Sequence, residues 1–349
     1  MALCTNTVFN IEVKGTGIAF PPKGKWVSNE EIHTMLYGEN WPEVMASKKL
    51  DPGYYFNEYG FSKRYWVHTP GTPVVHSELT SAYLMLAAAN QAIKNSNVKK
   101  DEIDFIIAVT ITSPRYSTSM GAYIAGLLGV RAPAIEMKSG CASNVFAMIL
   151  GAQLIQNGAR NVLIVCGETN SKIMKMESPV PYAGGDAGAA CILSAAKDNH
   201  KGIIASYLNT DGAYSSYMGV PGLMPPNKKD MEAGNYYLSF SDGANDFLNH
   251  AWRQIPEQLY KISGMKPGDI HYLIPHQVHK NRTVFASEAS GIPMHNTMNI
   301  ISEYANCGSA SLLLALHHAR EKNWLGSGNN IMLMAAGGGI SWGGFILQC

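Results

Sequence analysis

The sequence predicts an α/β protein built from two related halves. Short apolar segments typical of buried strands alternate with longer amphipathic segments typical of helices, which indicates a layered fold with mostly parallel central strands. Two segments resemble each other, 139–150 and 305–316: each opens a helix with small residues, and each helix precedes a buried strand. The 349 residues, 46% of them hydrophobic, are enough for a large core and about two domains.

The first half, 1–197, contains five apolar segments that we expect to be strands and four amphipathic ones that we expect to be helices. A capping box at 28–31 starts the first helix. Residues 37–73 are rich in Gly, Pro and aromatic residues and are expected to form a long surface excursion. The expected strands are 8–20, 104–110, 132–137, 161–166 and 188–194, and the expected helices are 32–36, 77–93, 119–128 and 141–158.

The second half, 198–349, begins within a polar break at 197–201. Its Gly-, Pro- and Met-rich segment 211–237 is expected to be a loop. The expected strands are 203–209, 269–274, 330–335 and 340–347, and the expected helices are 243–262, 278–290 and 307–320.

Composition excludes several classes of function. A net charge of +1 argues against broad binding to nucleic acid or to acidic membranes. The six cysteines are scattered without a C-x-x-C pair, so neither a disulfide framework nor a zinc ribbon is indicated. No signal peptide and no apolar run of about 18 residues is visible. We therefore expect a cytoplasmic protein without a membrane span, located in a reducing compartment.

Cys141 stands at the turn between an expected strand and an expected helix. The unpaired N–H groups and the dipole of a helix start favour an anion, so a thiol there tends to have a lowered pKa and to act as a nucleophile. The alternative is a buried structural cysteine, which is how we interpret Cys166 and Cys191 in their apolar strands.

Three further features accompany this cysteine: His276 directly after an expected strand, Asn306 at the second small-residue helix start, and the glycine run 337–339. Each has another reading. His276 could be a satisfied histidine, or a metal ligand together with His279, although no third ligand is evident. Asn306 could be a helix cap, and the glycines a tight turn. Together, a thiolate, an imidazole and an amide donor are the parts needed for acyl transfer through a thioester.

At this point the sequence resembles the β-ketoacyl-acyl-carrier-protein synthase III group of the thiolase superfamily, over nearly the whole chain. The motifs that carry the resemblance are Lys138-Ser-Gly-Cys-Ala, Gly185-Asp-Ala-Gly-Ala-Ala, Pro275-His-Gln, Asn306-Cys-Gly-Ser-Ala-Ser and Gly337-Gly-Gly-Ile-Ser-Trp-Gly. The resemblance implies a duplicated, five-layered α-β-α-β-α thiolase-like fold, usually a homodimer. It implies Cys141, His276 and Asn306 as catalytic residues, and the N–H groups of Cys141 and Gly338 as the oxyanion hole.

Three departures from the family pattern bear on the substrate. Glu58 stands where relatives that use coenzyme A often carry an arginine, and no arginine lies near 180–182. Ser117 falls where the family has a phenylalanine that narrows the acyl pocket across the dimer. We therefore expect Ser117, Gly339 and Ile340 at the substrate pocket. The acyl donor could therefore be a carrier protein, or CoA that is bound mainly through its pantetheine.

The resemblance implies a condensing enzyme of fatty-acid or polyketide-like metabolism. It would join a Cys-bound acyl group to a malonyl-type or β-ketoacyl thioester. Its substrates would be acyl-CoA or acyl-carrier-protein thioesters, and we expect neither a cofactor nor a metal. The basic pair Lys280 and Arg282 follows His276, and either docks an acidic carrier protein or is a solvated helix face. Two other functions stay open: an acyltransferase to alcohols or amines, and a non-catalytic subunit of a heteromeric synthase.

Overall fold

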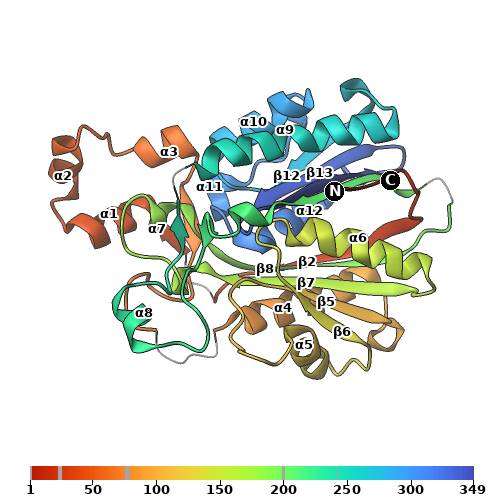
Figure 1. Ribbon diagram of the computed structural model, residues 1–349, viewed down its shortest axis with the longest axis horizontal. Helices are drawn as coiled ribbons and strands as arrows, with labels where there is room; N and C mark the ends of the chain where they lie inside the picture. Colours follow the sequence, from red (N-terminus) through yellow and green to blue (C-terminus); the bar gives the residue numbers. More distant parts are fainter. Residues whose placement is uncertain (1, 23–25, 75–78, 199–200, 242) are drawn as a thin grey trace.

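Two five-stranded sheets lie one above the other in the computed structural model, which describes residues 2–22, 26–74, 79–198, 201–241 and 243–349 (Figure 1). The predicted helix start at 77–78 and part of the predicted break at 197–201 lie outside these residues. Helices fill the space between the sheets and cover their outer faces. This is the five-layered α/β arrangement predicted above.

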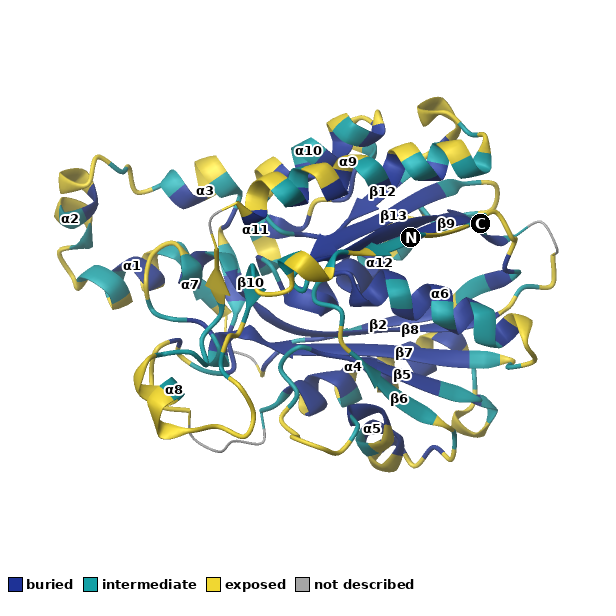
Figure 2. Ribbon diagram, viewed as in Figure 1, coloured by how far each residue is buried: buried dark blue, intermediate teal, exposed yellow. Residues whose placement is uncertain are grey.

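The first sheet comes from the first half of the chain. Its strand order is β2 (Ile11–Ala19), β8 (Asp186–Ala195), β7 (Asn161–Thr169), β5 (Phe105–Val109) and β6 (Ala134–Met137). Both faces of this sheet are covered, so β7 and β8 read as nearly continuous apolar runs without alternation (Figure 2).

The second sheet repeats this order. It runs β1 (Leu3–Thr5), β9 (Gly202–Thr210), β14 (Ser341–Gln348), β13 (Asn330–Gly337) and β12 (Tyr272–Pro275). The series β9-β14-β13-β12 corresponds to β2-β8-β7-β5, which confirms the predicted duplication of the fold. Each sheet adds one strand of its own, β6 at one edge and β1 at the other.

The prediction of mostly parallel central strands is wrong. Only β5–β6, β5–β7 and β12–β13 are parallel among the described strand pairs. The others are antiparallel, because β13 and β14 are joined by a tight glycine turn that needs no crossover and β8 returns along β7.

Two helices form the middle layer, α6 (Ser143–Gln156) and α12 (Ser311–Glu321), and their apolar residues belong to one core with both sheets. The helices α4 (Ser81–Ser96) and α5 (Met120–Leu128) cover the outer face of the first sheet. The helices α9 (Ala244–Ser263) and α10 (Lys280–Ser290) cover the second. Within the described ranges, no helix is long and apolar enough to cross a bilayer.

The predicted surface excursion has more structure than its composition indicated. It contains two short helices, α2 (Trp41–Ser47) and α3 (Tyr54–Tyr59), and the strand β4 (Lys63–Tyr65). This strand pairs antiparallel with β3 (Trp26–Ser28), which precedes the predicted first helix, α1 (Asn29–Tyr37). The predicted capping box of Ser28 and Glu31 is present at the start of α1. Aromatic residues give this segment a small core of its own: Tyr55 stacks on Tyr182 at 3.5 Å between ring centroids, and His33 bonds the Tyr182 hydroxyl at 2.6 Å.

The predicted loop 211–237 is likewise partly ordered. It carries β10 (Met218–Gly219), which pairs with β11 (Ser239–Phe240), and a short helix α8 (Lys228–Glu232). Two other short helices, α7 (Val180–Ala183) and α11 (Ile301–Tyr304), flank the region between the sheets.

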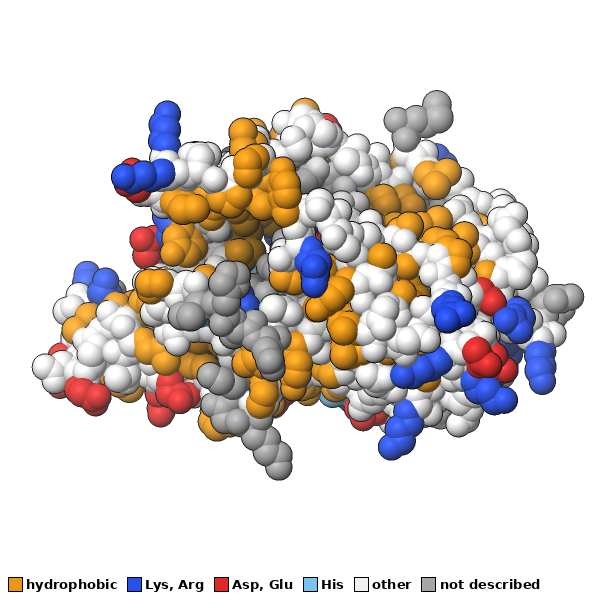
Figure 3. Space-filling model, turned by 90° about the horizontal axis from the view of Figure 1, so that it is seen from below, with side chains coloured by type: hydrophobic (Ala, Val, Ile, Leu, Met, Phe, Trp, Pro, Cys, Tyr) orange, Lys and Arg blue, Asp and Glu red, His pale blue; other side chains and the backbone are white. Residues whose placement is uncertain are grey.

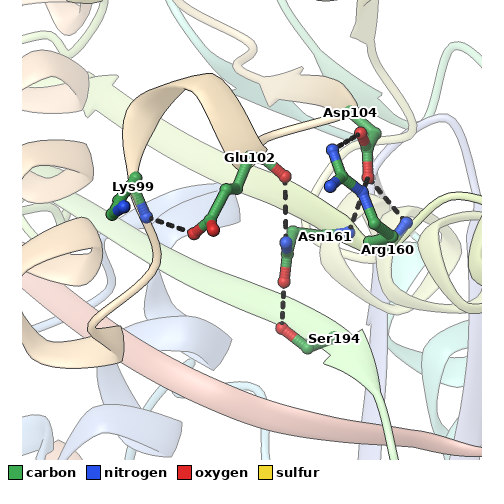
Figure 4. A network of polar contacts seen from close by, with 6 residues as sticks. All are labelled: Lys99, Glu102, Asp104, Arg160, Asn161 and Ser194. Carbon is green, nitrogen blue, oxygen red and sulfur yellow. Dashed lines mark hydrogen bonds and ion pairs between the residues drawn. The ribbon is translucent and has the colours of Figure 1, made fainter.

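A polar network fixes the amino ends of β5 and β7 (Figure 4). Asp104 accepts from the Arg160 guanidinium at 2.9 Å and from the Arg160 backbone N–H at 2.6 Å. Asn161 donates to the Glu102 carbonyl at 2.9 Å and accepts from the Ser194 hydroxyl at 2.6 Å. The strands are therefore tied together at one end, which leaves their carboxyl ends for the site.

We predict that Asp104→Asn lowers the free energy of unfolding by about 1 kcal/mol at neutral pH. The hydrogen bond from Arg160 is the main cause holding the pKa of Asp104 below its ordinary 3.8, so the charged carboxylate stabilises the fold above that pH and this contribution is lost as the pH falls through the lowered pKa. Denaturant unfolding of both proteins should show a difference that shrinks as the pH is lowered below 3.8. A difference that stays constant with pH would contradict the role of the charge.

Candidate active site

Cys141 lies in the turn between β6 and α6, one residue before the helix N-cap Ala142. The turn depends on Gly140, whose φ is 56° and whose position leaves no room for a side chain: a Cβ there would lie 2.2 Å from the Gly338 carbonyl oxygen. Ser143 closes the turn, because its hydroxyl accepts from the Ser139 N–H at 2.7 Å and donates to the Gly140 carbonyl at 2.6 Å.

The electrostatics of Cys141 differ from the expectation of a lowered pKa. Burial raises the pKa of the thiol to about 12, and the nearby charge of Glu168 acts in the same direction. Hydrogen bonds from the N–H groups of Gly338 and of Cys141 itself lower the pKa, by less. Desolvation outweighs the helix start here, so the thiol is protonated at neutral pH and needs a proton acceptor to become a nucleophile.

His276 is the candidate for that role, although it is not among the described residues that line the cavity with Cys141. It follows β12, its backbone N–H donates to the Met334 carbonyl at 2.8 Å, and its side chain is fully buried. Burial lowers the pKa of the imidazole to about 3, so the ring is neutral, and neither ring nitrogen has a hydrogen-bond partner among the described residues. Orphaned buried nitrogens are costly, which is a mark of a functional group rather than of a packed one.

The strand register brings His276 toward Cys141. β12 runs parallel to β13 with Pro275 opposite Met334, so His276 lies near the carboxyl end of β13. At that end, a Cβ on Gly337 would lie 2.5 Å from the Cβ of Cys141. His279 has a structural contact: its ring Nδ1 accepts from the Arg282 backbone N–H at 3.2 Å as the cap of α10.

Asn306 lies in the turn between α11 and α12 and is held on both sides. Its backbone N–H donates to the Ala183 carbonyl at 2.8 Å, and its carbonyl accepts from the Gly185 N–H at 3.0 Å. The side-chain Oδ1 accepts from the Gly308 N–H at 2.9 Å and from the Ser311 hydroxyl at 3.4 Å. These contacts occupy the amide oxygen, which leaves the NH₂ group as a donor.

Cys141, Asn306 and Gly338 line one cavity of about 650 Å³, a size typical of ligand sites. Much of its wall is apolar, which suits an acyl chain. The apolar side chains are Ile111, Ile173, Met174, Val180, Met218, Val220, Leu238 and Phe240. The structure therefore brings the predicted nucleophile, amide donor and oxyanion glycine together.

The other predicted pocket residues are divided. Gly339 lines the catalytic cavity, but Ile340 is fully buried in the core beneath α9. Ser117 lines a separate depression of about 390 Å³ with Arg115 and Tyr116. In the single chain, Ser117 and Ile340 therefore do not line the cavity that contains Cys141.

The predicted docking pair is also divided. Lys280 is exposed, and its ammonium donates to the Asn57 carbonyl at 3.2 Å. Arg282 is 7% exposed and donates to the Asn249 Oδ1 at 2.6 Å. A buried guanidinium held in this way cannot present its charge to a partner surface, so the expectation of a free basic pair is corrected for Arg282.

One buried carboxylate at the site was missed by sequence reasoning. Glu168 accepts from the Ile111 N–H at 3.0 Å, from the Thr112 hydroxyl at 2.7 Å and from the Ser309 hydroxyl. It thereby joins a cavity-wall residue to the turn that follows Asn306. The available signal was a charged residue inside an otherwise apolar strand.

The comparisons with known proteins agree over most of the chain. Residues 135–212 match the family described as 3-oxoacyl-[acyl-carrier-protein (ACP)] synthase III, and residues 261–349 match its C-terminal part. The β-ketoacyl-[acyl-carrier-protein] synthase III 3 of Streptomyces coelicolor is 30% identical over 339 residues, 94% of each chain. The synthase III of Rhodobacter capsulatus is 29% identical over 279 residues, 77% of this chain and 84% of that one.

Solved structures agree in fold. The synthase III of Aquifex aeolicus superposes with a TM-score of 0.81 at 21% identity, covering 97% of this chain and 100% of that one. A priming β-ketosynthase of a polyketide biosynthetic pathway superposes with a TM-score of 0.79 at 20% identity, covering 98% and 97%.

Proposed function

Because this chain belongs to the β-ketoacyl-[acyl-carrier-protein] synthase III family, we propose that it joins an acyl group on Cys141 to a malonyl-type thioester by decarboxylative Claisen condensation. The observation that carries the proposal is the shared cavity of Cys141, Gly338 and Asn306. The neutral, unpaired His276 at the same end of the second sheet supports it. The comparisons support a condensing enzyme of fatty-acid or polyketide biosynthesis.

In the proposed first step, His276 accepts the proton of the Cys141 thiol. The sulfur attacks the carbonyl of an acyl thioester, the carbon–sulfur bond to the donor breaks, and the donor leaves as a thiol with the proton. The N–H groups of Cys141 and Gly338, which both lower the pKa of the thiol, stabilise the oxyanion. One such donor is typically worth about 2.7–4 kcal/mol.

In the proposed second step, a malonyl-type thioester replaces the departed thiol. The bond to its carboxylate breaks and CO₂ leaves, so the electron pair moves into an enolate. A ring N–H of His276 and the NH₂ of Asn306 donate to the thioester oxygen that takes the charge. The carbanion attacks acyl-Cys141, a 3-oxoacyl thioester forms, and the sulfur of Cys141 is released to take up a proton.

The proposal extends to compartment and assembly. The six cysteines are all free, which fits the cytoplasm as a reducing compartment. Strand β6 ends the first sheet and pairs only with β5 among the described strands, while its residues are half-buried. An open edge of this kind pairs readily with a second copy, so we propose a homodimer joined there. Hydrophobic side chains cross the middle of the face on the α4 and α5 side (Figure 3).

The proposed reaction predicts that CO₂ is released from labelled malonyl thioester in step with 3-oxoacyl product, and only after Cys141 has been acylated. The physical reason is that the enolate formed by decarboxylation is consumed by the acyl-enzyme. Scintillation counting of CO₂ beside chromatography of the product measures both. If acyl-Cys141 forms but no CO₂ is released, and alcohols or amines discharge it instead, the protein is a plain acyltransferase.

A further inference from the structure

Lys138 is the one charged side chain among the described residues that line the catalytic cavity. It follows β6 directly, three residues before the nucleophile, and it is exposed. Within the described part of the chain its ammonium has no hydrogen-bond or ion-pair partner. Acyl chains are apolar and offer this cation no partner, whereas a substrate that carries an anionic group would offer one.

Part of the wall of this cavity is polar. Gly140 contacts Gly338, which places the Lys138–Gly140 turn beside the end of β13. At the same end of the second sheet, Thr210 is paired with Ser341, and their hydroxyls lie 2.9 Å apart. Ser139 and Ser215 also line the cavity. Hydroxyl donors and an ammonium thus share one cavity, and they are the groups that bind a carboxylate.

Other lining residues are apolar and come from different segments. The Ile173 carbonyl accepts a hydrogen bond from the Leu238 backbone N–H at 2.7 Å. The segment before α7 therefore contacts the segment between β10 and β11 at this point. Met174 and Val180 continue that apolar wall. The cavity therefore offers an apolar passage together with a cationic, hydroxyl-bearing wall.

We propose that Lys138 binds the carboxylate at the far end of the acyl group carried by Cys141, so that the acyl donors are thioesters of dicarboxylic acids. This inference rests on the proposed function and narrows its substrate class. Lys138 and Cys141 are three residues apart, so their Cα atoms are separated by at most about 11 Å. This limit favours short diacids, such as a succinyl or glutaryl group, over long-chain ones.

Two other anions have to be distinguished from this carboxylate as partners of Lys138. The carboxylate of a malonyl-type extender must leave as CO₂, and an ammonium bound to it would stabilise the ground state and slow its loss. The phosphate of a carrier-protein or CoA donor is common to every donor, so it would give no preference between acyl groups. The choice of donors in the experiment separates these sources.

The test measures the rate of acyl-Cys141 formation by intact-protein mass spectrometry, with pantetheine thioesters, which lack the CoA phosphates, and in parallel with the CoA thioesters. The wild type should load glutaryl groups faster than pentanoyl groups. In Lys138→Met the ratio of the two rates should fall by about 10- to 100-fold, the effect of one hydrogen bond to a charged group. Lys138→Arg should keep most of the ratio. Lys261→Met, an exposed lysine on α9 outside the cavity, should leave it unchanged.

Three results would overturn the inference: equal loading of both groups by the wild type, equal slowing of both by Lys138→Met, or an effect seen with CoA donors alone. The second would show that Lys138 acts on the thiol, and the third that it binds phosphate. A parallel calorimetric titration uses amide analogues of the two thioesters, which cannot react. Tighter binding of the glutaryl amide to wild type than to Lys138→Met, without acylation by any donor, would uphold this inference and reject the proposed function.

Discussion

Cys141→Ala should abolish acyl loading, so that no acyl mass is added from any thioester accepted by the wild type. No other cysteine lines the catalytic cavity within the described ranges, and Cys166, Cys191 and Cys307 are buried. Intact-protein mass spectrometry measures the outcome directly. Cys4→Ala, which removes an exposed thiol in β1, is the matched control and should load at the wild-type rate. Acylation that persists in Cys141→Ala would reject the assignment of the nucleophile.

The pH dependence of loading follows from the same site. An ordinary histidine would be protonated and lost as a base below about pH 6.5. Burial lowers the pKa of His276 to about 3, so the ring stays neutral, while the pKa of Cys141 is raised to about 12, so the thiol stays protonated. The loading rate should therefore be nearly constant between about pH 5 and pH 9. A rate that rises steadily with pH would show that free thiolate reacts without His276.

Asn306→Ala should form acyl-Cys141 but lose condensation by about 10²–10³ in rate. The amide oxygen is occupied by Gly308 and Ser311, so the NH₂ group is the part free to act on the enolate. Asn306→Asp keeps an acceptor for the Gly308 N–H but has no NH₂, and should be impaired at the same step. Asn281→Ala, at an exposed position on α10, is the control and should retain condensation.

His276→Ala should fail at condensation as Asn306→Ala does, and should also load more slowly because the thiol loses its proton acceptor. The ratio of acyl-enzyme to 3-oxoacyl product, followed by mass spectrometry over time, separates the two defects. If both variants condensed at the wild-type rate, enolate stabilisation would have to come from other groups in the cavity.

Much of the secondary structure could be predicted from local signals. The helix expected over 119–128 is α5, and the capping box at Ser28 starts α1. Strand direction could not be predicted, because an apolar run reads the same in a parallel and in an antiparallel pair. The aromatic core of the excursion was missed for a related reason: Tyr55 and Tyr182 are distant in sequence, and only the fold makes them stack.

The site was predictable in its residue types and less so in its energetics. Three features of the site have recognisable sequence patterns: the turn at Gly140, the strand before His276 and the small-residue turn at Asn306. The pKa of Cys141 could not be judged from the helix start alone, since desolvation depends on everything packed around the thiol. The roles of Glu168 and Lys138 could not be predicted either, because they depend on which segments of the chain come together around the cavity.

The pairing of β1 with β9 has a consequence for how the chain folds. Leu3–Thr5, at the start of the chain, align with Ser206–Leu208, so this strand has no partner until the second half has been made. The hydroxyl of Thr16 likewise lies 2.8 Å from Nδ1 of His317, near the other end of the sequence. Contacts of such long range are formed late and slowly. We therefore expect the two halves to complete folding together, after synthesis, and a nascent first half to expose the surface that it later buries against the second.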